Sequence, residues 1–131
     1  TVGTGIGGGF VIDRRIHGTD RPAASEIGHL RPGLAARDRH ETLESIAAGP
    51  GISERLLRRL ATRPATDPEV VDLTRRAGGE LSQLTTRHIG EAAAAGHSAA
   101  REVYHEATDA LGWGLAQMVT LLAPECVVVG G

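Results

Sequence analysis

A glycine-rich motif near the start of the chain has the composition of a phosphate-binding segment. It reads Gly-Thr-Gly-Ile-Gly-Gly-Gly over residues 3–9. Residues without a Cβ let the main chain adopt positive φ and turn N–H groups toward phosphate oxygens, and the Thr4 hydroxyl adds a donor. The motif lacks the Gly-Lys-Ser/Thr of a P-loop, and a strand-like Phe-Val-Ile follows it instead of the helix of a dinucleotide-binding fingerprint. The pattern alone leaves phosphate binding and a ligand-free glycine turn open.

A second group of residues has the chemistry of a polyol site. Glu26 and His29 stand three residues apart in Glu-Ile-Gly-His, and Glu44 follows further along the chain. Carboxylates accept hydrogen bonds from sugar hydroxyls and neutral His donates or accepts, so such a set can distinguish hydroxyl stereochemistry. The alternative is a surface Glu, a satisfied His, and a Glu44 that only favours the N-terminus of a short helix. Residue types do not decide between these alternatives.

Composition limits the chain to one domain and excludes several classes of protein. With 131 residues and 40% apolar content, it can build one ordinary core. The 14 basic residues are all Arg against 16 acidic ones, and the net charge of −2 shows no footprint for nucleic acid. Cys126 is the only cysteine, which excludes an internal disulfide framework and a cysteine zinc cluster.

The termini and the hydropathy pattern indicate where in the cell the protein is expected and whether the native chain is longer. No charged-then-apolar leader opens the sequence, and no stretch approaches the roughly 18 apolar residues of a membrane span. We therefore expect a soluble, cytoplasmic protein without a membrane partner. Because the chain starts at Thr1 and ends on Gly-Gly after a strand-like run, we also expect native sequence on both sides.

The elements that must position these residues begin with a hairpin and a long loop. Two β-prone runs at residues 10–12 and 15–17 surround Asp13-Arg14 and predict a hairpin. Residues 18–40 have no sustained period, so they form a long loop, and loops of that length are usually functional. With only Phe10, Tyr104 and Trp113 as aromatics, the rest of the core favours helices. We expect a helix-dominated α/β fold.

Apolar spacing and capping residues predict the remaining elements. A short helix begins near residue 41 and ends at Gly-Pro-Gly 49–51, and Ser53 caps the next helix, which ends before Pro64. Asp67 caps a helix from Pro68 that continues to residue 84 through a weak Gly-Gly pair. The last predicted elements are a helix from Thr85 or Thr86 to Gly96, a long helix over residues 97–122, weakly capped by His97, and a buried strand over residues 126–129.

The motifs and their order resemble the ROK family of repressors, open reading frames and sugar kinases. The landmarks are the glycine-rich motif, the hairpin, Ala24-Ser25-Glu26-Ile27-Gly28-His29, Leu43-Glu44-Ser45-Ile46-Ala47-Ala48-Gly49, residues 95–100, residues 111–116 and residues 122–131. The resemblance covers nearly the whole chain and is weakest over residues 52–84. It implies a ribonuclease-H-like lobe of actin and hexokinase type, with residues 1–131 as a single C-terminal lobe and the N-terminal lobe absent from this chain.

The resemblance also implies roles for individual residues. The phosphate-facing set is Gly3, Thr4, Gly5, Gly7 and Gly8, with Gly130 and Gly131 beside the adenosine. Glu26, His29 and Glu44 would hold sugar hydroxyls. The intact protein would be an ATP-dependent hexose kinase that uses ATP and Mg²⁺, and its catalytic Asp would lie in the N-terminal lobe. A sugar-sensing transcriptional repressor is the alternative, and a homodimer is compatible with the family.

One departure concerns zinc. Many similar proteins follow the Glu-x-Gly-His element with a Cys-x-Cys-Gly-x-x-Gly-Cys loop that, with the His, forms a closed tetrahedral zinc site. Here residues 31–42 contain no cysteine, and Thr42 stands where the last Cys would fall. The sequence therefore argues against zinc, offers no residue of this chain as a metal ligand, and leaves His29 only a sugar-facing role.

Overall fold

The computed structural model describes residues 1–21 and 24–131, so Pro22 and Ala23 of the predicted long loop lie outside the described residues. The elements in chain order are β1 (Val11–Ile12), β2 (Arg15–Ile16), the 3₁₀ helix η1 (Ile27–His29), α1 (Leu43–Ala47), α2 (Gly49–Leu60), α3 (Pro68–Arg76), the 3₁₀ helix η2 (Leu81–Gln83), α4 (Thr86–Ala94) and α5 (Ser98–Leu122).

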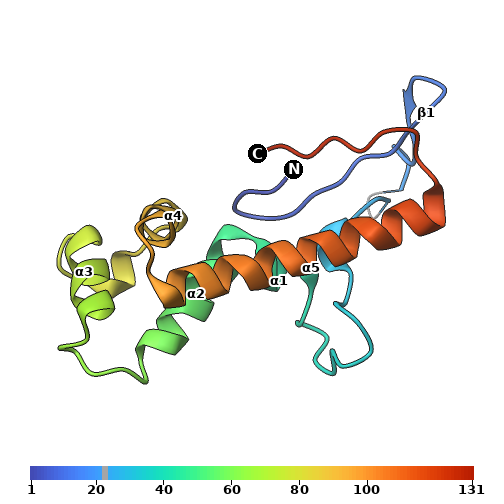
Figure 1. Ribbon diagram of the computed structural model, residues 1–131. Helices are drawn as coiled ribbons and strands as arrows, with labels where there is room; N and C mark the ends of the chain where they lie inside the picture. Colours follow the sequence, from blue (N-terminus) through green and yellow to red (C-terminus); the bar gives the residue numbers. More distant parts are fainter. Residues whose placement is uncertain (22–23) are drawn as a thin grey trace.

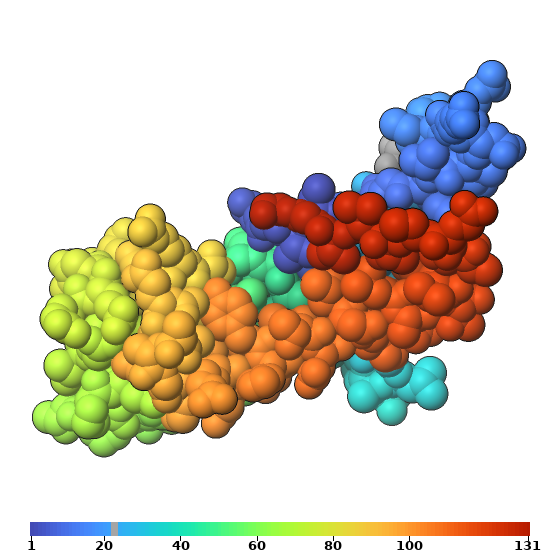
Figure 2. All heavy atoms as spheres, turned by 45° about the horizontal axis from the view of Figure 1, so that its top comes forward, coloured from blue at the N-terminus to red at the C-terminus, as the bar shows by residue number. Residues whose placement is uncertain are grey.

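Helix α5 is the axis of the molecule. Helices α1, α2 and α4 contact it, and α3 contacts α4 at the far end. The glycine-rich segment, the β1–β2 hairpin and the C-terminal residues lie along the other half of α5, as Figure 1 shows. Figure 2 shows the C-terminal residues in red resting on α5 beside the N-terminal residues in blue. The two ends of the chain therefore meet on one side of α5.

Small residues on α5 let the other helices approach closely. Ala99, Ala100 and Val103 of α5 are fully buried, and Leu43 of α1 packs against Gly114 of the same helix. Other large side chains that solvent does not reach are Leu56, Leu73 and Ile89. Each such side chain contributes about 1.5–3 kcal/mol by leaving water.

Side chains cap the starts of α3, α4 and α5. Asp67 accepts hydrogen bonds from the amides of Glu69 (2.8 Å) and Val70 (3.4 Å), and Thr85 caps α4, so both predicted starts are confirmed. His97 occupies the N-cap of α5 but makes no capping bond. Glu69 of α3 caps α5 instead, since it accepts hydrogen bonds from Ser98 N (2.5 Å) and Ala99 N (3.3 Å).

Two predicted helix boundaries are wrong. Gly-Pro-Gly 49–51 begins α2 instead of ending α1, because Pro is tolerated in a first turn, where its missing N–H is not needed. Ser53 consequently lies inside α2, and Ala48 is the N-cap. The helix from Pro68 ends at Arg76, well before residue 84, because Gly78 and Gly79 adopt φ of 77° and 109°.

The extended elements are only partly as predicted. The hairpin is confirmed, with Val11 paired to Ile16 and with positive φ at Asp13 and Arg14, as a tight hairpin turn requires. The predicted buried strand over residues 126–129 is wrong. These residues are exposed, 87% so for Val128, and none is assigned to a strand. A strand needs a neighbour to pair with, and the one described backbone bond to this end joins Val2 N to Gly130 O (2.8 Å).

None of the helices in residues 1–21 and 24–131 combines the length and the apolar composition needed to cross a bilayer.

Candidate functional site

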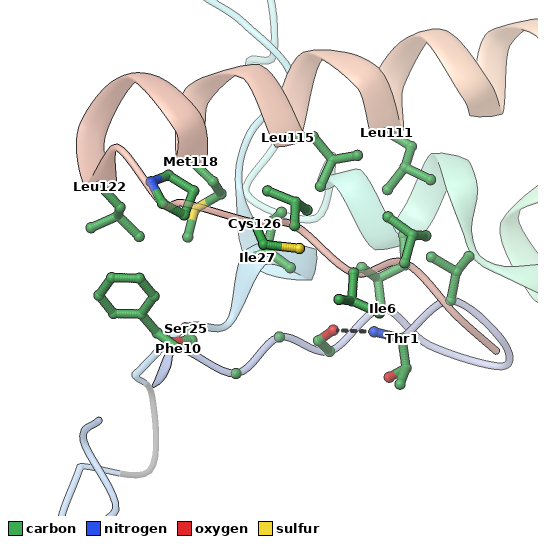
Figure 3. Close-up of a pocket in the computed structure, with 18 residues that line it drawn as sticks. Thr1, Ile6, Phe10, Ser25, Ile27, Leu111, Leu115, Met118, Leu122 and Cys126 are labelled. Atoms are coloured by element: carbon green, nitrogen blue, oxygen red, sulfur yellow. Dashed lines mark hydrogen bonds between the residues drawn. The ribbon is translucent and has the colours of Figure 1, made fainter. Parts of the chain in front are cut away.

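The glycine-rich segment folds into a tight turn with Thr4 at its exposed tip. Gly3 N donates to Gly5 O (2.9 Å), and Gly7 N donates to Thr1 O (3.1 Å), so the chain reverses direction within the motif. The Thr1 nitrogen also donates to Gly7 O at 2.8 Å, which is the dashed line in Figure 3. A Cβ added at Gly3 would meet no atom within 4 Å, so the tip is open on that side.

The turn presents main-chain donors that the protein itself does not use. The amides of Thr4, Gly5, Gly8 and Gly9 donate to no acceptor within the described ranges. Thr4, Gly8 and Gly9 are exposed, and Gly5 is partly so. Successive free N–H groups in a curved segment are a suitable cradle for phosphate oxygens, so the residues present fit a nucleotide phosphate.

Three neighbouring elements anchor this segment. Gly49 N, at the start of α2, donates to Gly3 O at 2.8 Å. Ile6 N donates to the Glu44 Oε2 carboxylate oxygen of α1 at 2.7 Å. The Ile6 carbonyl lies directly against Gly28 of η1, where any Cβ would overlap it. Because the Ile6 side chain is itself buried, the segment is fixed to the core at residue 6.

Close main-chain contact also joins the glycine-rich segment to the Glu-Ile-Gly-His motif. A Cβ on Gly8 would overlap the carbonyl oxygen of Ser25, as one on Gly28 would overlap that of Ile6. Glycine at both positions is what lets the two motifs lie in van der Waals contact. Ile27 lies between them and is buried in the same core as Ile6.

Glu26 and His29 share one turn of 3₁₀ helix. Glu26 is the N-cap of η1, and His29 N donates to Glu26 O at 3.1 Å. Residues three apart in a 3₁₀ helix project in similar directions, so both side chains stand on one side of the turn. Both are exposed, and neither is hydrogen-bonded to Glu44 within residues 1–21 and 24–131. The structure thus brings Glu44 to the glycine-rich segment and leaves Glu26 and His29 exposed to solvent on the neighbouring element η1.

The loop between η1 and α1 is closed at its base. Leu43 N donates to Leu30 O at 2.8 Å, which fixes the start of α1 next to the end of η1. Thr42, the position where a zinc loop would end in Cys, caps α1 by accepting a hydrogen bond from Ser45 N (3.3 Å). No group of three or more His, Cys, Asp or Glu side chains gathers as metal ligands within the described ranges.

The C-terminal glycines reach the same place. Gly130 O accepts the hydrogen bond from Val2 N (2.8 Å), and Gly131 lies against the main chain of Val2. The two predicted nucleotide-side segments, residues 3–8 and residues 130–131, therefore meet through Val2. Sequence reasoning missed the roles of Val2, Ile6 and Gly49, because main-chain contacts carry no signal in residue type.

An apolar cavity of about 170 Å³ lies behind the glycine-rich segment. Figure 3 shows Ile6, Phe10 and Ile27 on one wall and Leu115, Met118 and Leu122 of α5 on the opposite wall, with Cys126 of the C-terminal segment between them. Met118 also packs against the hydrophobic core. The cavity therefore lies between the glycine-rich segment and α5.

Comparisons with known proteins agree with this arrangement. The ROK family model matches residues 1–131. A glucokinase of Streptomyces coelicolor is 31% identical over 136 residues, which cover 100% of this chain and 42% of that protein. The chain therefore spans about two fifths of the length of the curated glucokinases it matches.

Two solved structures are similar in fold. A ROK family glucokinase from Streptomyces griseus, in complex with glucose and AMPPNP, superposes with a TM-score of 0.74 and 28% identity over 94% of this chain and 40% of that one. A ROK hexokinase from Thermus thermophilus has a TM-score of 0.74 and 29% identity over 100% of this chain and 39% of that one. The predicted fold class, a helix-rich lobe of the actin and hexokinase type, is confirmed by this similarity.

Proposed function

The chain belongs to the ROK family, and we propose that it forms the C-terminal lobe of an ATP-dependent hexose kinase. The observation that carries the proposal is that free main-chain donors of the glycine-rich turn lie directly against the elements that bear Glu26, His29 and Glu44. A kinase needs phosphate donors and sugar-hydroxyl acceptors side by side. The similar Streptomyces griseus glucokinase is described with glucose and AMPPNP, one ligand of each kind.

On the nucleotide side, the proposal uses the main chain of residues 3–8. The unpaired amides of Thr4, Gly5 and Gly8, and the Thr4 hydroxyl, would donate to phosphate oxygens. Gly3 and Gly7 let the chain pass close to the ligand, and Gly130 and Gly131 would lie on the adenosine side. Bound ATP supplies the phosphoryl group, and Mg²⁺ neutralises its charge.

On the sugar side, Glu26, His29 and Glu44 would accept and donate hydrogen bonds to the hydroxyls of a hexose. Their contribution is orientation, since they would hold the attacking hydroxyl in line with the phosphate. We place the general base, an Asp, outside this chain, in an N-terminal lobe. The whole enzyme would therefore close two lobes around the ligands and exclude water.

The test uses the complete protein and a panel of hexoses in an ATP-consumption assay. Loss of one hydrogen bond costs about 1.5–3 kcal/mol at a charged group and about 0.5–1.5 kcal/mol otherwise. Glu26→Ala should therefore raise the KM for the sugar by about 10- to 100-fold, and His29→Ala by about 2- to 10-fold. The KM for ATP should stay unchanged. His105→Ala, an exposed histidine on α5 away from the site, is the matched control and should leave both constants unchanged.

The outcomes separate the candidate functions. Unchanged sugar kinetics in both site variants would contradict the site assignment. Sugar binding without ATP consumption by any hexose would contradict the kinase and favour the sugar-sensing repressor, which would use the same sugar residues.

A further inference from the structure

We infer that Glu44 is a positioning residue that couples the sugar site to the phosphate-binding turn. One of its carboxylate oxygens holds the main chain of that turn, and the other receives a sugar hydroxyl. Sugar binding would then fix the amides that bind phosphate, and nucleotide binding would fix Glu44 for the sugar. This inference rests on the proposed function.

The first step is the contact between Glu44 and Ile6. Ile6 N donates to Glu44 Oε2 at 2.7 Å, in a partly buried setting and across 38 positions of sequence. A carboxylate acceptor makes this bond stronger than an ordinary amide–carbonyl bond. Gly5 permits the approach, because a Cβ there would lie only 2.7 Å from the same oxygen. The fold of the turn therefore includes this contact: Gly5 leaves the room that the Glu44 carboxylate needs to reach Ile6 N.

The second step is that this bond controls the direction of the phosphate donors. Thr4 and Gly5, whose amides are unpaired, directly precede Ile6. The turn is held at its other end by the hydrogen bond from Gly49 N to Gly3 O (2.8 Å). Between these two anchors the turn is closed on itself by the hydrogen bond from Gly3 N to Gly5 O (2.9 Å), and residues 4 and 5 have no hydrogen bond to any other described segment. The position of Glu44 therefore acts on how residues 4 and 5 face a ligand.

The third step is the second oxygen of the carboxylate. Oε1 of Glu44 accepts no hydrogen bond within the part of the chain that the structure describes, and the side chain is half-buried. A carboxylate offers about four acceptor positions, so a sugar hydroxyl can bind Oε1 while Oε2 keeps Ile6. The first ligand then immobilises the side chain, and the second binds without that ordering cost, which is positive coupling.

The test measures this coupling by calorimetry on the complete protein. The dissociation constant of a non-hydrolysable ATP analogue is measured with and without saturating hexose, and the converse is measured for the sugar. Linkage requires that each ligand lowers the dissociation constant of the other by the same factor, and we expect that factor to be at least about fivefold. Three variants separate the effect of the length of the Glu44 side chain from the effect of its negative charge. Glu44→Asp keeps the charge but is too short to hold Ile6, Glu44→Gln keeps the reach, and Glu44→Ala loses both.

We expect Glu44→Gln to retain most of the coupling, and Glu44→Asp and Glu44→Ala to bring the factor close to one. The same two variants should weaken the nucleotide alone by about tenfold, as expected for one lost charge-assisted bond. Glu26→Ala is the control: it should weaken the sugar but keep the coupling. If Glu44→Ala fails to fold, the Asp and Gln pair decides.

Two results overturn the inference while leaving the kinase intact. One is a wild-type protein that binds both ligands but shows the same dissociation constant for each ligand with and without the other. The other is coupling that survives in Glu44→Asp as well as in Glu44→Gln. Failure of the unchanged protein to bind any hexose would instead contradict the proposed function itself.

Discussion

Replacing Gly28 by Ala should force apart the two motifs of the candidate site. The added Cβ would lie 2.2 Å from Ile6 O and 3.2 Å from Ile6 C. A carbon and a carbonyl oxygen approach to about 3.3 Å, so the segments must separate by about 1 Å. Both sides of the contact are main chain, so no flexible side chain can move aside to relieve the overlap.

The size of the effect follows from that displacement. Inserting a methyl group into a packed contact costs about 1–3 kcal/mol of folding free energy. The same shift carries Glu26 and His29 away from the glycine-rich turn, and in the proposed kinase a misplacement of about 1 Å can lower the rate by about 100-fold. We therefore expect Gly28→Ala to lose both stability and kcat/KM.

The assay combines urea unfolding with ATP-consumption kinetics on the complete protein. Gly112→Ala is the matched control, because Gly112 is exposed inside α5 and an added Cβ there meets nothing within 4 Å. Alanine favours a helix interior over glycine by about 0.5–1 kcal/mol, so the control should be neutral or stabilising with unchanged kinetics. A Gly28→Ala protein as stable and as active as the unchanged one would refute the close approach of η1 to Ile6.

Two further predictions concern the helical part of the fold. Leu43→Ala should reduce the free energy of unfolding by about 3–5 kcal/mol, because the side chain is fully buried against α5. Leu121→Ala, at a position 75% exposed, should cost less than about 0.5 kcal/mol, and equal costs in urea unfolding would contradict the packing. Burial of Glu69 opposes its charged form, but hydrogen bonds from Ser98 and Ala99 outweigh it and hold the pKa of Glu69 below its ordinary value. Its stabilising contribution is therefore present above the ordinary pKa and lost as pH falls through the folded pKa, so Glu69→Gln should flatten the loss of stability between about pH 6 and about pH 3. Identical pH profiles would contradict the capping role.

The start of a helix could be predicted where the residue that caps it lies next to the helix in the sequence. Asp67 before Pro68 and Thr85 before α4 are local signals, since the capping bond joins residues two or three apart. The start of α5 shows the limit of that reasoning. Its cap is Glu69, 29 positions away, and only the folded chain brings it there.

The helix predicted to run from Pro68 to residue 84 was misjudged for a physical reason. Leu81 and Leu84 continue the apolar spacing of α3, and the structure does pack both against the core. They reach it from η2 and the residue after it, beyond Gly78 and Gly79. Apolar spacing reports which side chains are buried, and it identifies a helix only if the main chain between them is helical.

In the candidate site, residue types reveal the side chains that can bind a ligand, but they do not reveal the main-chain contacts that hold their elements together. Glu26, His29 and Glu44 attract attention because their side chains can bind hydroxyls. The contacts that join their elements to the glycine-rich turn instead use main-chain atoms: Ile6 N donates a hydrogen bond, Gly3 O accepts one, and Ile6 O lies against Gly28. Any residue has these atoms, so no sequence pattern names them. The glycines are the one trace they leave, because Gly5 and Gly28 occur where another segment leaves no room for a Cβ. Glycine in such a motif can therefore mark a contact between functional segments as well as a place for the ligand.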